Sequence, residues 1–331
     1  MGRFHAHYQV ILEWTLQRLP SGEPFCIFPV PMSFAYKLSE PDIPCAPWRI
    51  TLVTNPDVCN LACPLCFLRQ RGRPSGLGEM PWNMAEALLR KYASRGLREV
   101  IPSTMGEPLL YTHTDRLLGL CAELGLAVNL TTNGTFPGRP AEDWARRLFP
   151  VCRDIKVSLM GIRPGTIARL MPGVRPDVHL ENVRRLARVR AELSASGLRA
   201  GTLTLQVTVT RLSEPEIPEL LAFAASAGVT RVRLNRAVFL DCSSPELRRE
   251  LELPPEDRFA ADAPLPVDGT FTASFRAGVA GRSVHCPFPG KELWIFPDGS
   301  VQRCPNPEIR FGNGRFDSET CRKCPLWGNK E

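Results

Sequence analysis

The sequence predicts an α/β fold, a partial (β/α)6 barrel with a small C-terminal β-hairpin in a cysteine-rich region. Two observations predict the barrel. Six strand-like runs alternate with helical runs over residues 49–238, a pattern typical of parallel strands joined by right-handed crossovers. In addition, a glycine follows four of the helical runs, as helix C-termini prefer, at Gly96, Gly125, Gly197 and Gly228.

The elements follow one another in a regular order. The expected strands span residues 49–54, 98–104, 127–133, 153–159, 203–210 and 229–238. The expected helices span residues 84–96, 115–125, 141–149, 180–197 and 216–228. Six repeats instead of eight leave the barrel open, and the ligands of such barrels lie at the carboxyl ends of the strands.

The barrel is one of four predicted parts of the chain. A Pro-rich N-terminal extension, the barrel, a connecting segment and a cysteine-rich region span residues 1–48, 49–240, 241–285 and 286–331. Prolines oppose long regular structure in the extension, and we expect it to wrap or cover the barrel. In the cysteine-rich region, Asp298 and Gly299 predict the turn of a β-hairpin.

Composition excludes several classes of protein. The chain has 331 residues, 44% of them hydrophobic, and a net charge of +7. The arginines are dispersed, and their densest group, over residues 169–190, favours a solvated helix face over a nucleic-acid site. The sequence has neither a run of 18 apolar residues nor a signal peptide. We therefore expect a cytoplasmic protein that binds no membrane and no nucleic acid.

Twelve cysteines in a chain with no export signal favour metal or redox chemistry over disulfides. Cys59, Cys63 and Cys66 form a C-x-x-x-C-x-x-C run. Three thiolates on one short loop can hold three corners of a cubane [4Fe–4S] cluster and leave the fourth iron open. An open position is typical of a reactive metal site, because a structural site closes its coordination. The alternative is a group of three core or zinc-binding cysteines.

With this motif the chain resembles the radical S-adenosylmethionine (SAM) enzymes, which are also built on a partial (β/α) barrel. The resemblance implies that the amino and carboxylate groups of SAM chelate the open iron. It also implies that one electron, from a flavodoxin- or ferredoxin-type donor, cleaves SAM, and that the 5′-deoxyadenosyl radical abstracts a hydrogen atom from substrate. The cofactors supply this chemistry, while the protein supplies binding, orientation and exclusion of water.

Two further motifs lie at strand ends. Gly106, Glu107 and Pro108 follow the second expected strand and resemble the family's GEP-like element, which implies backbone and carboxylate acceptors for the amino group of SAM. Asn133 and Gly134 follow the third and resemble its TNG element. That implies a cofactor contact by Asn133 and a positive φ at Gly134. The alternative for Asn133 is a turn residue.

The fourth expected strand ends at Ser158, in the place of the family's S-x-D-G element, which implies a contact to the carboxylate or ribose of SAM. Met160 replaces the Asp of that element. Leu65 and Phe67, on either side of the third cysteine, are expected to contact adenine. Gln206, in the fifth strand, is a candidate to point into the barrel.

A second cysteine set, near the end of the sequence, consists of Cys286, Cys304, Cys321 and Cys324. It resembles the opening of the SPASM pattern and its shortened form, Twitch. The resemblance implies an auxiliary [4Fe–4S] cluster that is ligated by all four cysteines. The alternative is a structural zinc site, which C-x-x-C pairs suit equally well.

The resemblance implies either a small-molecule or a peptide substrate. The 48 residues before the barrel are too short and Pro-rich for the winged domain of peptide modifiers. We therefore expect oxidation or epimerisation of a small molecule such as a sugar or aminocyclitol. Cys242, just beyond the sixth strand, is a candidate hydrogen-atom donor for an epimerase or else an ordinary loop cysteine. Peptide modification by a RiPP maturase and a non-catalytic metal-binding scaffold are the alternatives.

Overall fold

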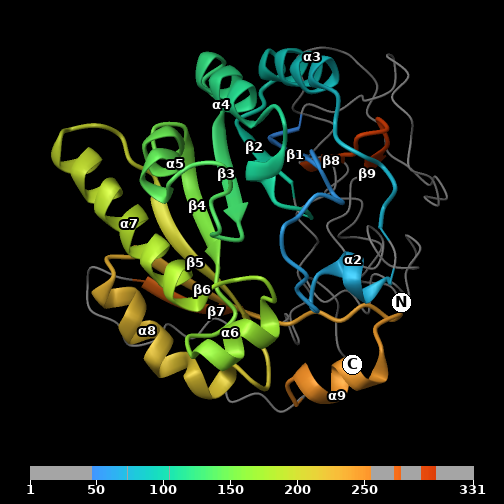
Figure 1. The fold of residues 1–331 in the computed structure, drawn as a ribbon. Helices are drawn as coiled ribbons and strands as arrows, with labels where there is room; N and C mark the ends of the chain where they lie inside the picture. The colour runs from blue at the N-terminus through green and yellow to red at the C-terminus, as the bar shows by residue number, and fades with distance from the viewer. Residues whose placement is uncertain (1–46, 73, 104, 255–271, 277–291, 303–331) are drawn as a thin grey trace, which may run out of the picture.

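A computed structural model describes residues 47–254 (except 73 and 104), 272–276 and 292–302. These residues form a nine-stranded sheet in the order β7-β6-β5-β4-β3-β2-β1-β8-β9. All neighbouring strands from β7 to β8 are parallel, and β9 is antiparallel to β8. Within the described residues the edge strands β7 and β9 do not pair with each other (Figure 1). The barrel is therefore open, as the sequence predicts.

The six expected strands are confirmed. They are β1 (Arg49–Leu52), β2 (Glu99–Pro102), β3 (Ala127–Thr132), β4 (Cys152–Ser158), β5 (Thr202–Val209) and β6 (Arg231–Arg236). Two more parallel strands widen the sheet: β7 (Thr272–Arg276) pairs with β6, and β8 (Glu292–Ile295) pairs with β1. The sequence analysis placed β7 in a connecting segment, because strands of four or five residues give little periodic signal.

Helices cover the outer face of the sheet (Figure 1). The five expected helices are confirmed as α3 (Trp82–Ala93), α4 (Thr114–Glu123), α5 (Ala141–Leu148), α7 (Pro176–Ala195) and α8 (Ile217–Ser226). The sequence analysis missed the short elements α2 (Phe67–Gln70), α6 (Pro164–Leu170), α9 (Pro245–Leu251), η1 (Pro108–Leu110) and η2 (Glu214–Glu216). Elements this short span two turns or fewer, so the helical period does not show in the sequence. No helix in the described part of the chain is long and apolar enough to cross a membrane.

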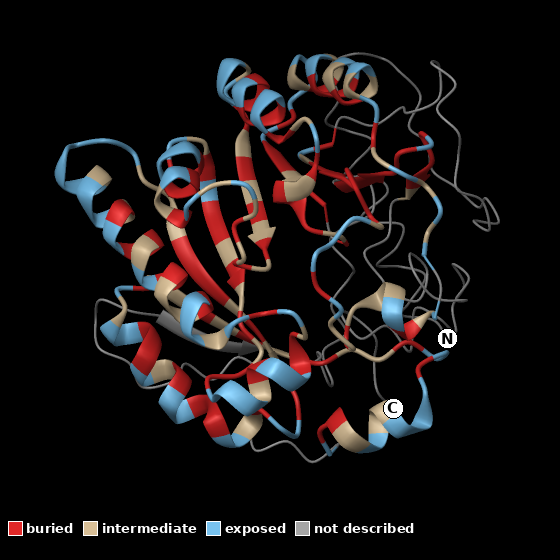
Figure 2. Ribbon diagram, in the orientation of Figure 1, coloured by how far each residue is buried: buried red, intermediate tan, exposed pale blue. Residues whose placement is uncertain are grey.

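The main core lies between the sheet and these helices, where buried residues face one another (Figure 2). Alternation along β3 separates the two faces of the sheet: Val128 and Leu130 belong to this core, while Asn129 and Thr131 are half-buried and face the barrel interior. Each large apolar side chain that is fully buried contributes about 2 kcal/mol to stability. The interior is therefore the polar side of the sheet, and the core holds the strands in register around it.

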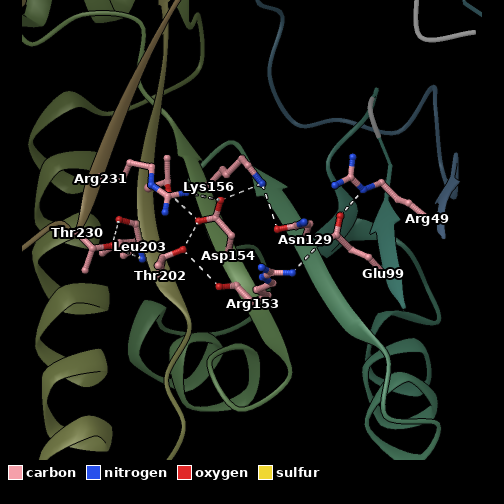
Figure 3. Close-up of polar contacts among 11 residues, drawn as sticks. Arg49, Glu99, Asn129, Arg153, Asp154, Lys156, Thr202, Leu203, Thr230 and Arg231 are labelled. Atoms are coloured by element: carbon pink, nitrogen blue, oxygen red, sulfur yellow. Dashed lines mark hydrogen bonds and ion pairs between the residues drawn. The ribbon is translucent and has the colours of Figure 1, made fainter. Parts of the chain in front are cut away.

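Ion pairs and hydrogen bonds link charged and polar side chains of neighbouring barrel strands (Figure 3). Arg49 on β1 forms ion pairs with Glu99 on β2 and Glu292 on β8. On β4, Asp154 lies 3.2 Å from the ammonium group of Lys156. Burial alone would raise the pKa of Asp154, but Lys156 and neighbouring hydroxyl groups lower it below its usual value. The network thus joins β8 to the barrel at the end opposite the carboxyl ends of the strands.

The predicted C-terminal hairpin is confirmed. Strand β9 (Val301–Gln302) pairs antiparallel with β8. In the turn, Gly299 has a φ of +81°, and the Asp298 carboxylate accepts a hydrogen bond from the Ser300 N–H at 2.9 Å. The hairpin therefore adds to the edge of the barrel sheet beside β1.

Candidate active site

Three cysteines line one cavity at the carboxyl ends of the strands. Cys59, Cys63 and Cys66 lie on the loop after β1, and the cavity they share has a volume of about 970 Å³. The N–H of Cys66 donates to the backbone oxygen of Cys63 at 3.1 Å, and Cys66 is the N-cap of α2. A tight turn therefore presents the second and third cysteines together.

The donor set of this loop fits an iron–sulfur cluster. Burial, and then the charges of Cys59 and Cys66, raise the pKa of Cys63 to about 12; burial also raises the pKa of Cys59. Thiolates here therefore need a cation to compensate their charge. No three His, Cys, Asp or Glu side chains in the described residues are placed to hold a single metal ion. A cubane instead takes each thiolate at a separate iron corner.

The other walls of the cavity come from the strand ends. They include six residues that the sequence analysis proposed, namely Leu65, Phe67, Gly106, Glu107, Asn133 and Ser158. The cavity is thus formed by loops that are far apart in the sequence and that the parallel sheet brings to one edge.

The loop after β2 packs against the backbone of residues 55–58, the segment that precedes Cys59. Gly106 has a φ of +71°, and a Cβ there would overlap the backbone oxygen of Asn55 and lie 2.8 Å from that of Val58. The N–H of Glu107 donates to the Val58 oxygen at 2.8 Å, and the Asn55 side-chain amide donates to the Glu107 oxygen at 2.7 Å. Only glycine allows this close approach.

Gly106→Ala is therefore expected to destabilise the fold by about 3 kcal/mol, since it adds both an overlap and a disfavoured φ. The matched control is Gly119→Ala in α4, where no atom lies within 4 Å of the Cβ position. Because alanine favours helix, the control should gain up to about 1 kcal/mol. Denaturant unfolding of both variants measures the two effects, and equal stabilities would contradict the close approach at Gly106.

The Glu107 carboxylate links the loops after β2 and β3. The residue is 1% exposed and accepts hydrogen bonds from the Asn133 N–H at 2.7 Å, the Thr132 hydroxyl at 2.7 Å and the Leu109 N–H at 3.2 Å. Both carboxylate oxygens are engaged in these contacts. Because Glu107 also lines the cavity, a cation bound there would face a carboxylate that is already held in position.

Burial raises the pKa of Glu107 from 4.5 to about 7, although the hydrogen bonds from Asn133, Thr132 and Leu109 oppose the rise. The folded state then binds this proton more tightly than the unfolded state. The contribution of Glu107 to the free energy of unfolding is therefore fully present below pH 4.5. This contribution, about 3 kcal/mol, is lost as the pH rises through about 7. Unfolding free energies of the wild type and Glu107→Gln, measured against pH, should diverge across this window, and parallel curves would refute the assignment.

Asn133 faces the cysteine loop. Its amide nitrogen donates to the Asn60 side-chain oxygen at 2.8 Å and lies 3.7 Å from the Cys59 sulfur. Its side-chain oxygen accepts hydrogen bonds from the N–H of Thr135 at 3.0 Å and from the Thr135 hydroxyl at 2.7 Å. Asn133 is therefore a turn residue and also a neighbour of Cys59. The positive φ expected at Gly134 is confirmed, at +78°.

A neutral polar arc forms the barrel side of the cavity. It consists of the inward-facing residues Thr131, Ser158, Gln206, Thr208 and Asn235. The side-chain oxygen of Gln206 is buried and has no hydrogen-bond partner among the described residues, which is unfavourable by about 1–3 kcal/mol. A donor on a bound molecule would satisfy this oxygen. The sequence analysis missed Thr208 and Asn235, although Thr208 has the strand parity of Gln206 and is paired with Asn235.

Leu65 and Phe67 face different hydrophobic clusters. Leu65 packs in a cluster that Met160 contacts, whereas Phe67 packs on a cluster that contains Met105 and Trp294. Met160 lies two residues after Ser158, so the Leu65 cluster adjoins the polar arc. Both residues line the cavity, and their contact with adenine stays a prediction.

The sequence matches the family model of the radical SAM superfamily over residues 56–224, about half of the chain. The match runs from the loop that carries the three cysteines into helix α8. This chain belongs to the radical SAM superfamily. The fold and the cysteine loop described above are therefore those of a radical SAM protein.

Solved structures of SuiB from Streptococcus suis have a similar fold at 18% identity. The structure bound to S-adenosylmethionine gives a TM-score of 0.58 and covers 85% of this chain and 67% of SuiB. The structure bound to the precursor peptide SuiA gives 0.55 and covers 80% and 60%. A further SuiB structure gives 0.57, with 79% and 61% covered, so the chain spans about three fifths of that protein. No curated protein matches the sequence.

Two residues proposed for the radical SAM site lie outside the cavity wall, Pro108 and Cys242. Pro108 begins η1 behind Glu107. Cys242 is exposed, and its sulfur lies 3.9 Å from the backbone oxygen of Gln70. Cys242 was proposed because it follows the sixth strand. That position in the sequence does not indicate whether the side chain points toward the cavity or toward solvent.

The auxiliary-cluster cysteines fall outside the described residues. They are Cys286, Cys304, Cys321 and Cys324. The same holds for the Pro-rich extension up to residue 46. The expected auxiliary site and the expected cover over the barrel therefore stay predictions.

Proposed function

We propose that this chain binds a [4Fe–4S] cluster through Cys59, Cys63 and Cys66 and binds SAM at the iron that they leave open. When bound, these cofactors supply reductive cleavage of SAM and a 5′-deoxyadenosyl radical that abstracts a hydrogen atom from substrate. One observation carries the proposal: the three cysteines share a cavity with the ends of the barrel strands. A flavodoxin- or ferredoxin-type protein would deliver the electron.

Different residues of the cavity wall would contact different parts of SAM. Backbone atoms beside Gly106 would accept hydrogen bonds from the amino group, with the Glu107 carboxylate behind them. Ser158 would contact the carboxylate or ribose. Leu65, with Met160 next to it, would supply the apolar surface for adenine, because its cluster adjoins Ser158. In these roles the protein orients SAM and excludes water from the reacting bond.

We propose a small polar molecule, such as a sugar or an aminocyclitol, as substrate. The arc from Thr131 to Asn235 offers hydroxyl and amide groups, which pair well with hydroxyl and amino groups of a ligand. A peptide is the second candidate, because the similar SuiB has been solved with a precursor peptide. The test adds aminocyclitols, sugars or short peptides to the reduced protein with SAM. Small molecules should accelerate 5′-deoxyadenosine release, and acceleration by peptides alone would refute this substrate class.

Oxidation is the reaction we propose for that substrate: after the 5′-deoxyadenosyl radical has taken one hydrogen atom, the substrate radical would lose a proton, and its electron would pass to the auxiliary iron–sulfur cluster proposed below. Epimerisation needs a hydrogen-atom donor near the substrate, and the donor candidate Cys242 is exposed and outside the cavity wall. Product formed in D₂O should then carry no deuterium at the reacting carbon. Deuterium incorporation that Cys242→Ala abolishes would favour the epimerase instead.

We further propose an auxiliary [4Fe–4S] cluster on Cys286, Cys304, Cys321 and Cys324. The confirmed hairpin supports it, since Gln302 of β9 lies two residues before Cys304 in the sequence. Anaerobically reconstituted protein should hold about eight iron atoms per chain, and a Cys321→Ser, Cys324→Ser variant about four. About four iron atoms and one zinc in the wild type would instead show a structural zinc site. A protein with zinc alone would be the non-catalytic scaffold.

A further inference from the structure

One segment outside the sequence motifs contacts three parts of the site: the cysteine loop, the loop after β3 and the end of β4. We call residues 171–182, which comprise the whole α6–α7 connection and the first two turns of α7, the bracing segment. Its first contact is with the cysteine loop: the Ala62 N–H donates to the Pro172 oxygen at 3.4 Å. A Cβ at Gly173 would lie 3.2 Å from the Leu61 side chain, so the two backbones pack closely here.

The second contact reaches the end of β4. His179 on α7 is 2% exposed, and its Nε2 lies 3.0 Å from the backbone oxygen of Ser158. A carbonyl oxygen only accepts, so Nε2 carries the proton and donates. Burial keeps the ring neutral by lowering its pKa. The ring also packs under Gly134, where a Cβ would lie 2.5 Å from its Cε1 atom.

The third contact reaches the loop after β3. The Asn182 side chain, also buried, donates to the backbone oxygen of Gly134 at 3.0 Å. Gly134 directly follows Asn133, which contacts Asn60 and Cys59. A displacement at Asn182 would therefore be passed to the cysteine loop through Gly134 and Asn133.

We propose that the bracing segment is a positioning element for SAM, in which His179 and Asn182 fix the spacing between the β3 loop and the end of β4. The inference rests on the proposed function, since it assumes that Asn133 and Ser158 face bound SAM. Neither side chain lines the cavity, so both act through the backbone of the loops. Their loss should weaken SAM binding while the three cysteines still hold the cluster.

The chain offers a matched control on the same helix. The guanidinium of Arg190, also on α7, donates to the backbone oxygen of Gly201 at 2.8 Å. Gly201 lies just before β5, at the end of the sheet away from the cavity. Arg190→Leu therefore removes a comparable contact between helix and loop without touching the site.

The experiment compares His179→Leu, His179→Gln, Asn182→Asp and Arg190→Leu with the wild type after anaerobic reconstitution. Equilibrium dialysis gives the Kd for SAM, and iron analysis and thermal unfolding report on the cluster and the fold. We expect His179→Leu and Asn182→Asp to raise the Kd about tenfold at unchanged iron content, as loss of one buried hydrogen bond predicts. Glutamine can place a donor near the Nε2 position, so His179→Gln should restore binding. Arg190→Leu should change only the unfolding temperature.

Three results would overturn parts of this account. Unchanged Kd values in both His179→Leu and Asn182→Asp, with wild-type binding intact, would refute the inference alone. An equal rise in Arg190→Leu would show a general effect of helix stability and refute it as well. A wild type that holds iron but binds no SAM would refute the proposed function and the inference with it. If His179→Leu does not fold, Asn182→Asp decides, because it keeps the size of the side chain.

Discussion

Replacing Cys59, Cys63 and Cys66 together with alanine is expected to abolish reductive cleavage of SAM. The three thiols line one cavity, and we propose that they hold the iron at which SAM binds. Without them neither the electron carrier nor the binding site for SAM is formed. The measurement is 5′-deoxyadenosine released after reduction with dithionite, together with iron per chain, which should fall by about four atoms.

The control for this variant is Cys121→Ala. Cys121 is fully buried in α4 within the main core and does not line the cavity. Its replacement should lower stability by about 1 kcal/mol, through lost packing, and leave iron content and 5′-deoxyadenosine release unchanged. Release by the triple variant at the rate of this control would exclude the loop as the cofactor site.

Arg49→Met is expected to destabilise the fold by about 3–5 kcal/mol, because it removes the guanidinium from two largely buried carboxylates. The side chains of Glu99 and Glu292 are 3% and 10% exposed. In this variant Glu99 would keep a long ion pair with Arg153, at 4.0 Å. Since Glu292 lies on β8, the same substitution should loosen the β8–β9 hairpin. Denaturant unfolding and amide exchange in β8 measure these two effects.

An exposed ion pair provides the comparison for Arg49. Arg90 contacts Glu123 at 2.7 Å, with the two side chains 44% and 59% exposed. Arg90→Ala should change stability far less than Arg49→Met, since solvent screens such a pair. Similar losses in the two variants would mean that the network in the barrel is no stronger than a surface contact.

The sequence was sufficient for the parts of the site that depend on strand order. Six strands with helices between them place every βα loop at one edge, so strand order alone assigns Gly106, Asn133 and Ser158 to one cavity. The glycine at 134 was predicted for its φ, and the positive value is confirmed. These predictions succeeded because periodicity and turn chemistry are local properties.

Contacts between distant segments could not be predicted in this way. Leu65 and Phe67 lie two residues apart but face different clusters, and strand β8 joins β1 across more than two hundred residues. His179 has the pattern of an ordinary helical residue, and only the packing of α7 on the β3 and β4 loops shows what it contacts. Such contacts depend on tertiary packing, and no local pattern in a single sequence indicates them.

The most direct test is electron–nuclear double resonance of the reduced protein with SAM that carries ¹⁵N in its amino group. A nitrogen bound to the open iron should give a hyperfine coupling from ¹⁵N that is absent with unlabelled SAM. Absence of any such coupling in protein that retains its iron and binds SAM would contradict coordination at the iron left by Cys59, Cys63 and Cys66.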